Sequence, residues 1–273
     1  MRSSLPDGPG PPDARFTASG AYERFMGRWS RQLAARFVAF AGVADGDAVL
    51  DVGCGTGALA FAAAAIGPGV RVEGVDRSAA YVRAAEQAAG GRARFRVGDA
   101  LHLDAPAAAF DRTLSLLALN FVPDRERAVA EMCRVTRPGG VVAAAVWDYG
   151  DGMTMLRRFW DAAAAIDPGA RDLDEAAMPL CRSGELTAAW RGAGLDAVDE
   201  QALVIEMRFA GFDDYWAPFL EGEGPAGRQA AGMSPTARRA LAEALFRALL
   251  GDGPDRGFTL PARAWAVRGV VPR

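Results

Sequence analysis

Lysine is absent from this sequence, so all 31 basic residues are arginine. Chemistry that needs a primary amine, such as Schiff-base catalysis or the lysine of a phosphate-binding P-loop, is therefore excluded. The chain has one histidine, His102, and three cysteines that form no CxxC pair, Cys54, Cys133 and Cys181. These numbers rule out zinc sites built from cysteine and histidine, and we expect no metal cofactor. An odd number of unpaired cysteines is typical of reduced thiols, and we expect a cytoplasmic protein.

The sequence also lacks an excess of positive charge, because its 34 acidic residues outnumber the basic ones and give a net charge of −3. This balance disfavours nucleic acid as a partner. No early segment is apolar enough for a signal peptide or a membrane span, so we expect no membrane partner. With 51% apolar and 24% charged residues among 273, the chain has the composition of a globular protein, whose oligomeric state the sequence leaves open.

The chain divides into a short tail and one long domain. Residues 1–14 are rich in proline and glycine without periodicity, which predicts a disordered tail before a single domain over 15–273. Apolar residues at helical spacing between Phe25 and Phe40 predict a first helix, which ends at Gly42.

Strands and helices alternate from there to residue 149, a rhythm that predicts a parallel sheet with right-handed crossovers. The expected strands are 47–52, 70–76, 92–99, 110–119 and 140–149, and the expected helices are 58–66, 78–89 and 124–136. Two later strands, over 198–209 and near the C-terminus, should complete the sheet antiparallel. Proline has no backbone N–H, so the last strand should begin at or after Pro261, or Pro261 should lie where it need not donate a hydrogen bond to a neighbouring strand. The predicted fold is therefore α/β: a doubly wound, mostly parallel seven-stranded sheet with helices on both faces. Helical insertions at about 151–182 and 212–250 should cap the active site.

Residues 49–60, VLDVGCGTGALA, place three glycines between a buried strand and a helix. In an open parallel sheet, ligands bind at the carboxyl ends of the strands, where a glycine turn lets the backbone approach closely. The dinucleotide fingerprint is G-x-G-x-x-G, built around a pyrophosphate, whereas Gly53, Gly55 and Gly57 have the spacing G-x-G-x-G. Asp51 precedes them and would repel a pyrophosphate, so the turn favours a ligand with positive charge and disfavours a nicotinamide-dependent oxidoreductase.

Two more acidic residues follow strands. Asp76 ends the second strand, 19 residues after Gly57, which is the distance of a carboxylate that binds the two hydroxyls of a ribose. Asp99, in VGDA at the end of the third strand, is placed to accept from an adenine amino group while the next backbone N–H serves a ring nitrogen.

These motifs together, LDVGCGTG, GVDRS, GDA, FDRTLSLLALNFVPD and RPGG, resemble the class I S-adenosylmethionine-dependent methyltransferases. The likeness covers residues 20–150 and is greatest to the small-molecule branch that includes quinone-biosynthesis and type 11 enzymes. It implies that S-adenosylmethionine is the cofactor and that its three parts are held by residues matching the family motifs. For the methionine part these are Asp51, Gly53, Cys54, Gly55 and Gly57; for the ribose Asp76, Arg77 and Ser78; for the adenine Asp99 and Ala100; and Leu116 and Leu117 would line the cofactor.

In relatives the first helix folds over the cofactor, which implies a contact from Tyr22. Arg31, or Arg28, would then pair with the methionine carboxylate. The same helical spacing is also expected of a helix that only packs against the domain. Both interpretations stay open at this point.

The acceptor and any catalytic base are less well defined. Methyl transfer needs positioning above all, and it needs a base only where the acceptor must lose a proton. The candidates are Asn120 after the fourth strand, where relatives carry histidine; His102 after GDA; and Asp148 and Tyr149 after the fifth strand. Asparagine is a poor base, so Asn120 favours orientation of the acceptor.

The expected acceptor is a small, partly apolar molecule, methylated by in-line displacement. An aromatic pocket is predicted from the inserted segments, with the residues Phe159, Trp160, Trp190, Tyr215, Trp216 and Phe219, although Phe159 and Trp190 also have the spacing of core residues. The sequence lacks the D/N-P-P-aromatic motif of amino methylation of DNA bases and the Pro-Cys pair of cytosine methylation. The alternatives are a protein that binds S-adenosylmethionine without methyl transfer, as a sensor or scaffold, and non-methyl chemistry on the same cofactor.

Overall fold

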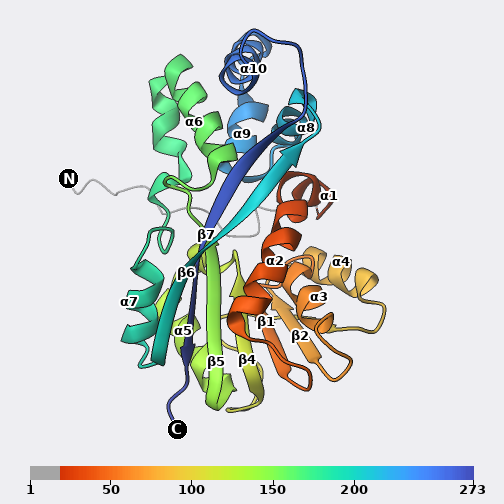
Figure 1. The fold of residues 1–273 in the computed structure, drawn as a ribbon, viewed down its shortest axis with the longest axis vertical. Helices are drawn as coiled ribbons and strands as arrows, with labels where there is room; N and C mark the ends of the chain where they lie inside the picture. Colours follow the sequence, from red (N-terminus) through yellow and green to blue (C-terminus); the bar gives the residue numbers. More distant parts are fainter. Residues whose placement is uncertain (1–18) are drawn as a thin grey trace, which may run out of the picture.

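A computed structural model describes residues 19–273, so the predicted tail at 1–14 lies outside the described residues. Figure 1 shows a long twisted sheet with helices along both sides of its lower part and a second group of helices around its upper end. The sheet has seven strands in the order β3-β2-β1-β4-β5-β7-β6. The predicted fold class is therefore confirmed.

The five expected parallel strands form close to their predicted bounds. They are β1 (Ala48–Val52), β2 (Arg71–Asp76), β3 (Arg94–Val97), β4 (Phe110–Leu116) and β5 (Thr136–Trp147). The last two, β6 (Asp196–Phe209) and β7 (Phe258–Val270), are antiparallel to their neighbours, as predicted. Strand β1 lies in the middle of the sheet and is buried over its last four residues, so its sequence AVLDV is nearly continuously apolar rather than alternating.

The strand order reverses between β1 and β4, and this reversal divides the helices between the two faces. The chain runs outward from β1 to β3 through α3 (Ala58–Ala64) and α4 (Ala79–Ala89), and then returns to β4 and continues outward in the opposite direction through α5 (Arg125–Val135). Right-handed crossovers that run in opposite directions place their helices on opposite faces. Accordingly, α2 (Arg28–Ala41) packs against α3, whereas α5 packs against α7 (Glu185–Gly192).

The N-terminal helical segment is interrupted by a π-helical turn, η2 (Glu23–Gly27), between α1 (Ser19–Tyr22) and α2. The sequence periodicity predicted one helix and did not reveal this turn. Such turns often mark functional sites because they redirect side chains within a helix. Helix α2 ends at Gly42, whose φ of +67° gives the left-handed cap expected of a glycine.

The two inserted segments form helices that surround the extended ends of β6 and β7 (Figure 1). The first contains α6 (Thr154–Ile166), η4 (Pro168–Leu173) and η5 (Glu175–Ala177), and the second contains α8 (Phe212–Trp216), η6 (Ala217–Glu221), α9 (Gly224–Gly232) and α10 (Pro235–Leu250). Helix α9 was not predicted, because GPAGRQAAG carries three glycines and a proline. Tertiary packing of its alanines against η6 and η4 overrides that weak propensity.

The prediction that β7 starts at or after Pro261 is wrong, because the strand starts at Phe258 and Pro261 pairs with Glu206 of β6. The alternative expectation, that Pro261 lies where no N–H is needed for a hydrogen bond to the neighbouring strand, fits the geometry. The N–H of Arg263, two residues on, donates to the carbonyl of Gly152 and thus points away from β6. Since alternate residues of a strand point their N–H groups to the same side, Pro261 removes no bond from the β6–β7 ladder.

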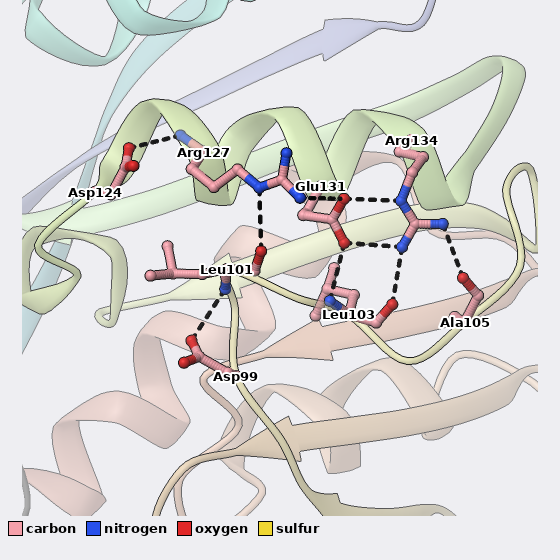
Figure 2. A network of polar contacts seen from close by, with 8 residues as sticks. All are labelled: Asp99, Leu101, Leu103, Ala105, Asp124, Arg127, Glu131 and Arg134. Atoms are coloured by element: carbon pink, nitrogen blue, oxygen red, sulfur yellow. Dashed lines mark hydrogen bonds and ion pairs between the residues drawn. The ribbon is translucent and has the colours of Figure 1, made fainter.

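A buried carboxylate on α5 holds the loop that follows β3 (Figure 2). Glu131 accepts a hydrogen bond of 2.9 Å from the N–H of Leu103 and pairs with Arg134 on the same helix. Arg134 in turn donates to the carbonyls of Leu103 and Ala105, and Arg127 donates to the carbonyl of Leu101. The loop therefore takes its position from one helix rather than from its own sequence.

Replacement of Glu131 by glutamine should reduce stability in a pH-dependent way. The hydrogen bond with Arg134 is the largest of the effects that lower the pKa of Glu131 to about 2, well below its ordinary value of 4.5. The stabilising contribution of the ionised group is therefore complete above about pH 4.5 and is lost as the pH falls from there toward 2. Urea unfolding between pH 3 and 7 should show a steeper acid loss in the wild type than in Glu131→Gln.

The matched control is Glu126→Gln, which changes an exposed residue on the same helix. Its stability curve should follow the wild type at every pH. Parallel curves for the wild type and Glu131→Gln would contradict the assigned role of the network.

Candidate active site

A cavity of about 480 Å³ lies where the strand order reverses, at the carboxyl ends of β1 and β4. Its walls come from the loops after β1 to β5, from the N-terminal segment α1–η2, and from the inserted helices. Open parallel sheets bind ligands at this place because two neighbouring loops diverge there and leave a crevice. The inserted segments contribute Leu156, Glu175, Gly224 and Pro225 to the walls.

Three glycines shape the turn after β1, with φ of +77° at Gly53, +51° at Gly55 and +92° at Gly57. All three lie in the left-handed region that side-chain-bearing residues avoid. A Cβ at Gly53 would lie 2.4 Å from the Cβ of Ala118, and one at Gly57 would lie 2.8 Å from the ring of Phe61. At Gly55 a Cβ would meet no atom within 4 Å, so this position opens into the cavity. Gly53 and Gly55 line the cavity, whereas Gly57 caps α3 behind it.

Asp51 is buried at the end of β1 and lines the cavity. Its Oδ2 accepts a hydrogen bond of 3.0 Å from the N–H of Ala60, whereas Oδ1 has no hydrogen-bond partner among the described residues. Burial raises the pKa of this carboxyl to about 8, with a smaller contribution from the charge of Asp76. A ligand ammonium group beside Oδ1 would satisfy the unpaired oxygen and compensate the buried charge.

Cys54 lines the cavity next to this aspartate, and its N–H donates to the carbonyl of Val75. Burial, with the nearby charges of Asp51 and Asp76, raises the pKa of the Cys54 thiol well above its ordinary value. The thiol is therefore neutral and unsuited to act as a nucleophile.

Asp76 lies at the end of β2, as predicted, and ties the glycine turn to this strand. Its Oδ2 accepts from the N–H of Gly55 at 2.9 Å and its Oδ1 accepts from the N–H of Ser78 at 2.8 Å. Each carboxylate oxygen can accept more than one bond, so hydroxyl groups of a ligand can still bind there. Arg77 and Ser78 also line the cavity, and Ser78 is the N-cap of α4.

The loop after β3 brings Asp99 and Ala100 to the cavity wall. Asp99 Oδ1 accepts from the N–H of Leu101, and the network of Glu131 holds this residue's carbonyl from the other side (Figure 2). The predicted adenine-binding loop is thus fixed at both ends. Across the cavity, Leu116 and Leu117 line the end of β4, and Leu117 has a left-handed φ of +61°. A strained residue of this kind is typical of a functional site.

Tyr22 reaches the cavity from the N-terminal segment, where its hydroxyl lies 3.3 Å from Ser30 Oγ and its ring lies 5.7 Å from that of Tyr81. Next to it, Glu23 accepts a hydrogen bond from Thr56 in the glycine turn. This contact holds the segment over the turn and encloses the cavity. Arg28 and Arg31 do not line the cavity: Arg28 pairs with Asp214, and Arg31 is exposed and pairs with Glu23.

Of the four predicted catalytic candidates, one lines the cavity. Tyr149 does so, and burial together with the charge of Glu175 raises the pKa of its phenol well above the ordinary value, so it stays neutral. His102 is exposed on the loop after β3, and Asn120 is buried with its amide 3.9 Å from the sulfur of Met178. Asp148 forms an ion pair with Arg263 at 2.6 Å. Although burial raises the pKa of Asp148, the N–H of Asp151 and the guanidinium of Arg263 bring it below its usual value.

Sequence reasoning missed several polar side chains on the wall, among them Glu175 and Trp147. Glu175 is 7% exposed in the inserted segment and lines the cavity, and its Oε2 accepts a hydrogen bond of 2.5 Å from Trp160 Nε1. Trp147 ends β5, and its Nε1 has no hydrogen-bond partner among the described residues. Nothing distinguishes Glu175 in the sequence from the other acids of RDLDEAAM, because only the tertiary fold brings this segment to β5.

The predicted aromatic pocket is not formed by the residues named for it, and the core positions expected for Phe159 and Trp190 are confirmed. The six aromatic residues named for it are buried but do not line the cavity. Five of them pack against one another beneath the inserted helices, whereas Trp190 belongs to α7 and donates from Nε1 to the carbonyl of Val142. Phe159 stacks on Phe219, and the hydroxyl of Tyr215 donates to the carbonyl of Met155. The aromatic wall is made instead by residues from elsewhere in the chain: Tyr22, Phe25, Tyr81, Phe121, Trp147 and Tyr149.

Within residues 19–273, no group of His, Cys, Asp and Glu side chains has the arrangement of a metal site. In the same part of the chain, no helix combines the length and hydropathy needed to cross a membrane. The three cysteines are free thiols.

Comparison with known proteins places the chain among methyltransferases. Residues 50–144 match the family model described as "Methyltransferase domain". Nocamycin O-methyltransferase of Saccharothrix syringae is 30% identical over 207 residues, which cover 70% of this chain and 74% of that protein. Sterol 24-C-methyltransferase of Eremothecium gossypii is 32% identical over 139 residues, which cover 49% of this chain but only 36% of that protein.

A solved structure shows the same fold. Phosphoethanolamine N-methyltransferase 2 of Haemonchus contortus, in complex with phosphomonomethylethanolamine and S-adenosylhomocysteine, superposes with a TM-score of 0.59 at 19% identity. The superposition covers 95% of this chain and 59% of that one.

The two cavity glycines should respond differently to alanine. Gly53→Ala adds a left-handed strain of about 1–2 kcal/mol and a clash with Ala118, and overpacking of this kind costs about 1–3 kcal/mol more. Gly55→Ala adds only the strain, because its Cβ meets open space. Urea unfolding should therefore show the larger loss for Gly53→Ala, and equal losses would contradict the packing difference between the two positions.

Proposed function

The chain belongs to the class I S-adenosylmethionine-dependent methyltransferases of the type 11 family, and from this premise we propose that it methylates a small, partly apolar molecule inside the cavity between β1 and β4. Its cofactor is S-adenosylmethionine, which supplies a methyl group already activated on a sulfonium. The relatives are methyltransferases, so transfer is favoured over a role as sensor or scaffold. The observation that carries the proposal is the unpaired Oδ1 of Asp51 beside the open face of Gly55.

The residues on the wall fit the chemistry of this cofactor. Asp51 would hold the ammonium of its methionine part, and Gly55 leaves the space for it. Asp76 would accept from the ribose hydroxyls, and the fixed loop of Asp99 and Ala100 would hold the adenine. Among the wall residues that the structure describes, Arg77 is the one base, so Arg77 rather than Arg31 is the nearest candidate for a carboxylate partner.

The protein's contribution to transfer is orientation and the exclusion of water. The glycine turn and the loop held by Glu131 would position the cofactor, and the aromatic wall would position the methyl acceptor. Holding two reactants in line gains roughly 7–11 kcal/mol relative to reaction in solution. The N-terminal segment, held by the hydrogen bond between Thr56 and Glu23, covers part of the cavity.

The acceptor that we propose is neutral and carries its reactive atom on an apolar body. Four carboxylates line the cavity, Asp51, Asp76, Asp99 and Glu175, against the single Arg77, and this balance disfavours polyanions such as nucleic acids. The O-methyltransferase relative supports oxygen as the accepting atom. The three free thiols support a reducing compartment, the cytoplasm.

Calorimetric titration with S-adenosylhomocysteine tests the cofactor assignment, with NADH as the parallel control. We expect saturable one-to-one binding of the first and none of the second. Asp76→Ala should weaken binding by about tenfold or more, since hydrogen bonds to a charged group contribute about 1.5–3 kcal/mol. Unchanged affinity in this variant would show that the ribose does not bind at Asp76.

Binding should also release protons at neutral pH. Because Asp51 has a pKa of about 8 in the free protein, most molecules carry a proton there at pH 7. An ammonium placed at Oδ1 lowers that pKa, so S-adenosylhomocysteine should displace up to about one proton. Titrations at pH 7 in two buffers with different ionisation enthalpies measure this number. Equal binding enthalpies in the two buffers would contradict the role of Asp51, and Asp51→Asn should abolish the difference.

A further inference from the structure

Glu175 lies in the half of the cavity away from the predicted cofactor residues. The carboxylates among those residues lie at or after the ends of β1, β2 and β3, whereas Glu175 belongs to the inserted segment and lines the cavity together with Trp147 and Tyr149 from the end of β5. The two segments meet beside the cavity, because a Cβ at Gly150, next to Tyr149, would lie 3.7 Å from the carbonyl oxygen of Ala176, next to Glu175. The charge of Glu175 accordingly acts on the phenol of Tyr149. The acceptor half of the cavity therefore has one carboxylate, one phenol and the indole N–H of Trp147 on its walls.

The carboxylate of Glu175 has one oxygen available. Oε2 accepts from Trp160 Nε1, which fixes the orientation of the group, while Oε1 accepts no hydrogen bond from another residue within the described part of the chain. The nearest cation, Arg157, is paired with Asp174 and does not line the cavity. The phenol of Tyr149 likewise forms no hydrogen bond with another residue in the described range. Oε1 of Glu175 and the hydroxyl of Tyr149 can therefore form hydrogen bonds with a ligand.

Building on the proposed function, we propose that Glu175 is a catalytic residue that accepts the proton of an acceptor hydroxyl, and that Tyr149 orients the same oxygen by a hydrogen bond. The acceptor oxygen forms its bond to the methyl carbon while the carbon–sulfur bond breaks and leaves its electron pair on sulfur. The hydroxyl proton passes to Oε1. A sulfonium and a carboxylate thus become a thioether and a carboxylic acid, so charge is balanced without any other group.

The same arrangement favours a hydroxyl over other acceptors. A carboxylate beside an amine stabilises the ammonium form, which has no lone pair with which to attack. An anionic acceptor, such as a carboxylate or a phosphate, would meet Glu175 without a compensating cation, because Arg77 lies at the other end, beside Asp76. The fitting class is a neutral, apolar molecule with an acidic hydroxyl, such as a phenol or an enol.

The groups around Glu175 also determine the pH range in which its carboxylate can accept a proton. Burial is the largest of the effects that raise its pKa to about 7; Asp174 raises it further, and Trp160 and Arg157 lower it. Tyr149 and Cys181, on its other side, are neutral because their own pKa values are raised. Proton acceptance should therefore increase as the pH rises through about 7 and level off above it.

The test uses 2-naphthol as the hydroxyl probe and 2-methoxynaphthalene, which has no proton to give, as its matched control. Both are added to the full-length protein saturated with S-adenosylhomocysteine at pH 8. The protein is kept in large excess so that nearly all of the probe is bound in each variant, because free 2-naphthol also transfers its proton to water when excited. In the wild type, bound 2-naphthol should then show the long-wavelength naphtholate emission of a probe beside a proton acceptor. Glu175→Gln should lose this emission and bind 2-naphthol about tenfold or more weakly, because a hydrogen bond to a charged group is lost. The methoxy compound should bind both proteins equally.

Two further variants separate a chemical role from a structural one. Glu175→Gln keeps an acceptor for Trp160 Nε1, so its unfolding midpoint and its affinity for S-adenosylhomocysteine should equal those of the wild type. Tyr149→Phe should weaken 2-naphthol binding but keep the naphtholate emission. Glu243→Gln, an exposed position on α10, should behave as the wild type in every measurement.

The proposal is overturned if naphtholate emission persists in Glu175→Gln, if 2-naphthol binds both proteins equally, or if it fails to bind the wild type. These outcomes are distinct from failure of the proposed function, which would appear as absence of S-adenosylhomocysteine binding in the wild type itself.

Discussion

The sharp turn after β1 is the constraint on which the rest of the site depends. The N–H groups of Gly53 and Cys54 donate to the carbonyl of Val75, and Gly55 donates to Asp76, so the turn is bound to the end of β2. This binding requires left-handed backbone at the glycines, and it leaves the face of Gly55 open. The crevice at the strand reversal thereby becomes a cavity with defined walls, and the carboxylate of Asp51 lies buried at its base with one oxygen unpaired.

Around that turn, the molecule surrounds the cavity with segments far apart in the sequence. Glu131 on α5 fixes the loop after β3, and Glu23 on the π-helical turn contacts Thr56 from the opposite side. The N-terminal segment is tied in turn to the inserted helices by ion pairs of Arg24 with Glu221 and Arg28 with Asp214. These surface pairs stabilise little individually. Together they hold the N-terminal segment and the inserted helices over the same cavity.

Two carboxylates with raised pKa values mark the two halves of this cavity. Asp51 and Glu175 are both buried, and each has one oxygen that accepts no hydrogen bond from another residue in the described part of the chain. A buried charge without a partner is unfavourable, so both positions are stabilised by a ligand with a complementary group. The fold alone would not identify the chemistry, because a likeness at 19% identity shows architecture only. The functional argument rests on these two groups and on the sequence relationship.

Local sequence determined the alternating strands and helices, the glycine turn, the cap at Gly42 and the placement of Asp76 and Asp99, because each depends on periodicity or on one residue's backbone preference. The seven strands, their mostly parallel pairing and the antiparallel last strands were predicted as well, whereas the order of the strands in the sheet was not. Only the tertiary structure decided which aromatic residues form the wall, that Pro261 lies within β7, that α9 is a helix, and that Glu175 meets Tyr149. Each of these depends on contacts between segments distant in sequence, where burial and packing outweigh local propensity and leave no pattern in the chain to be recognised.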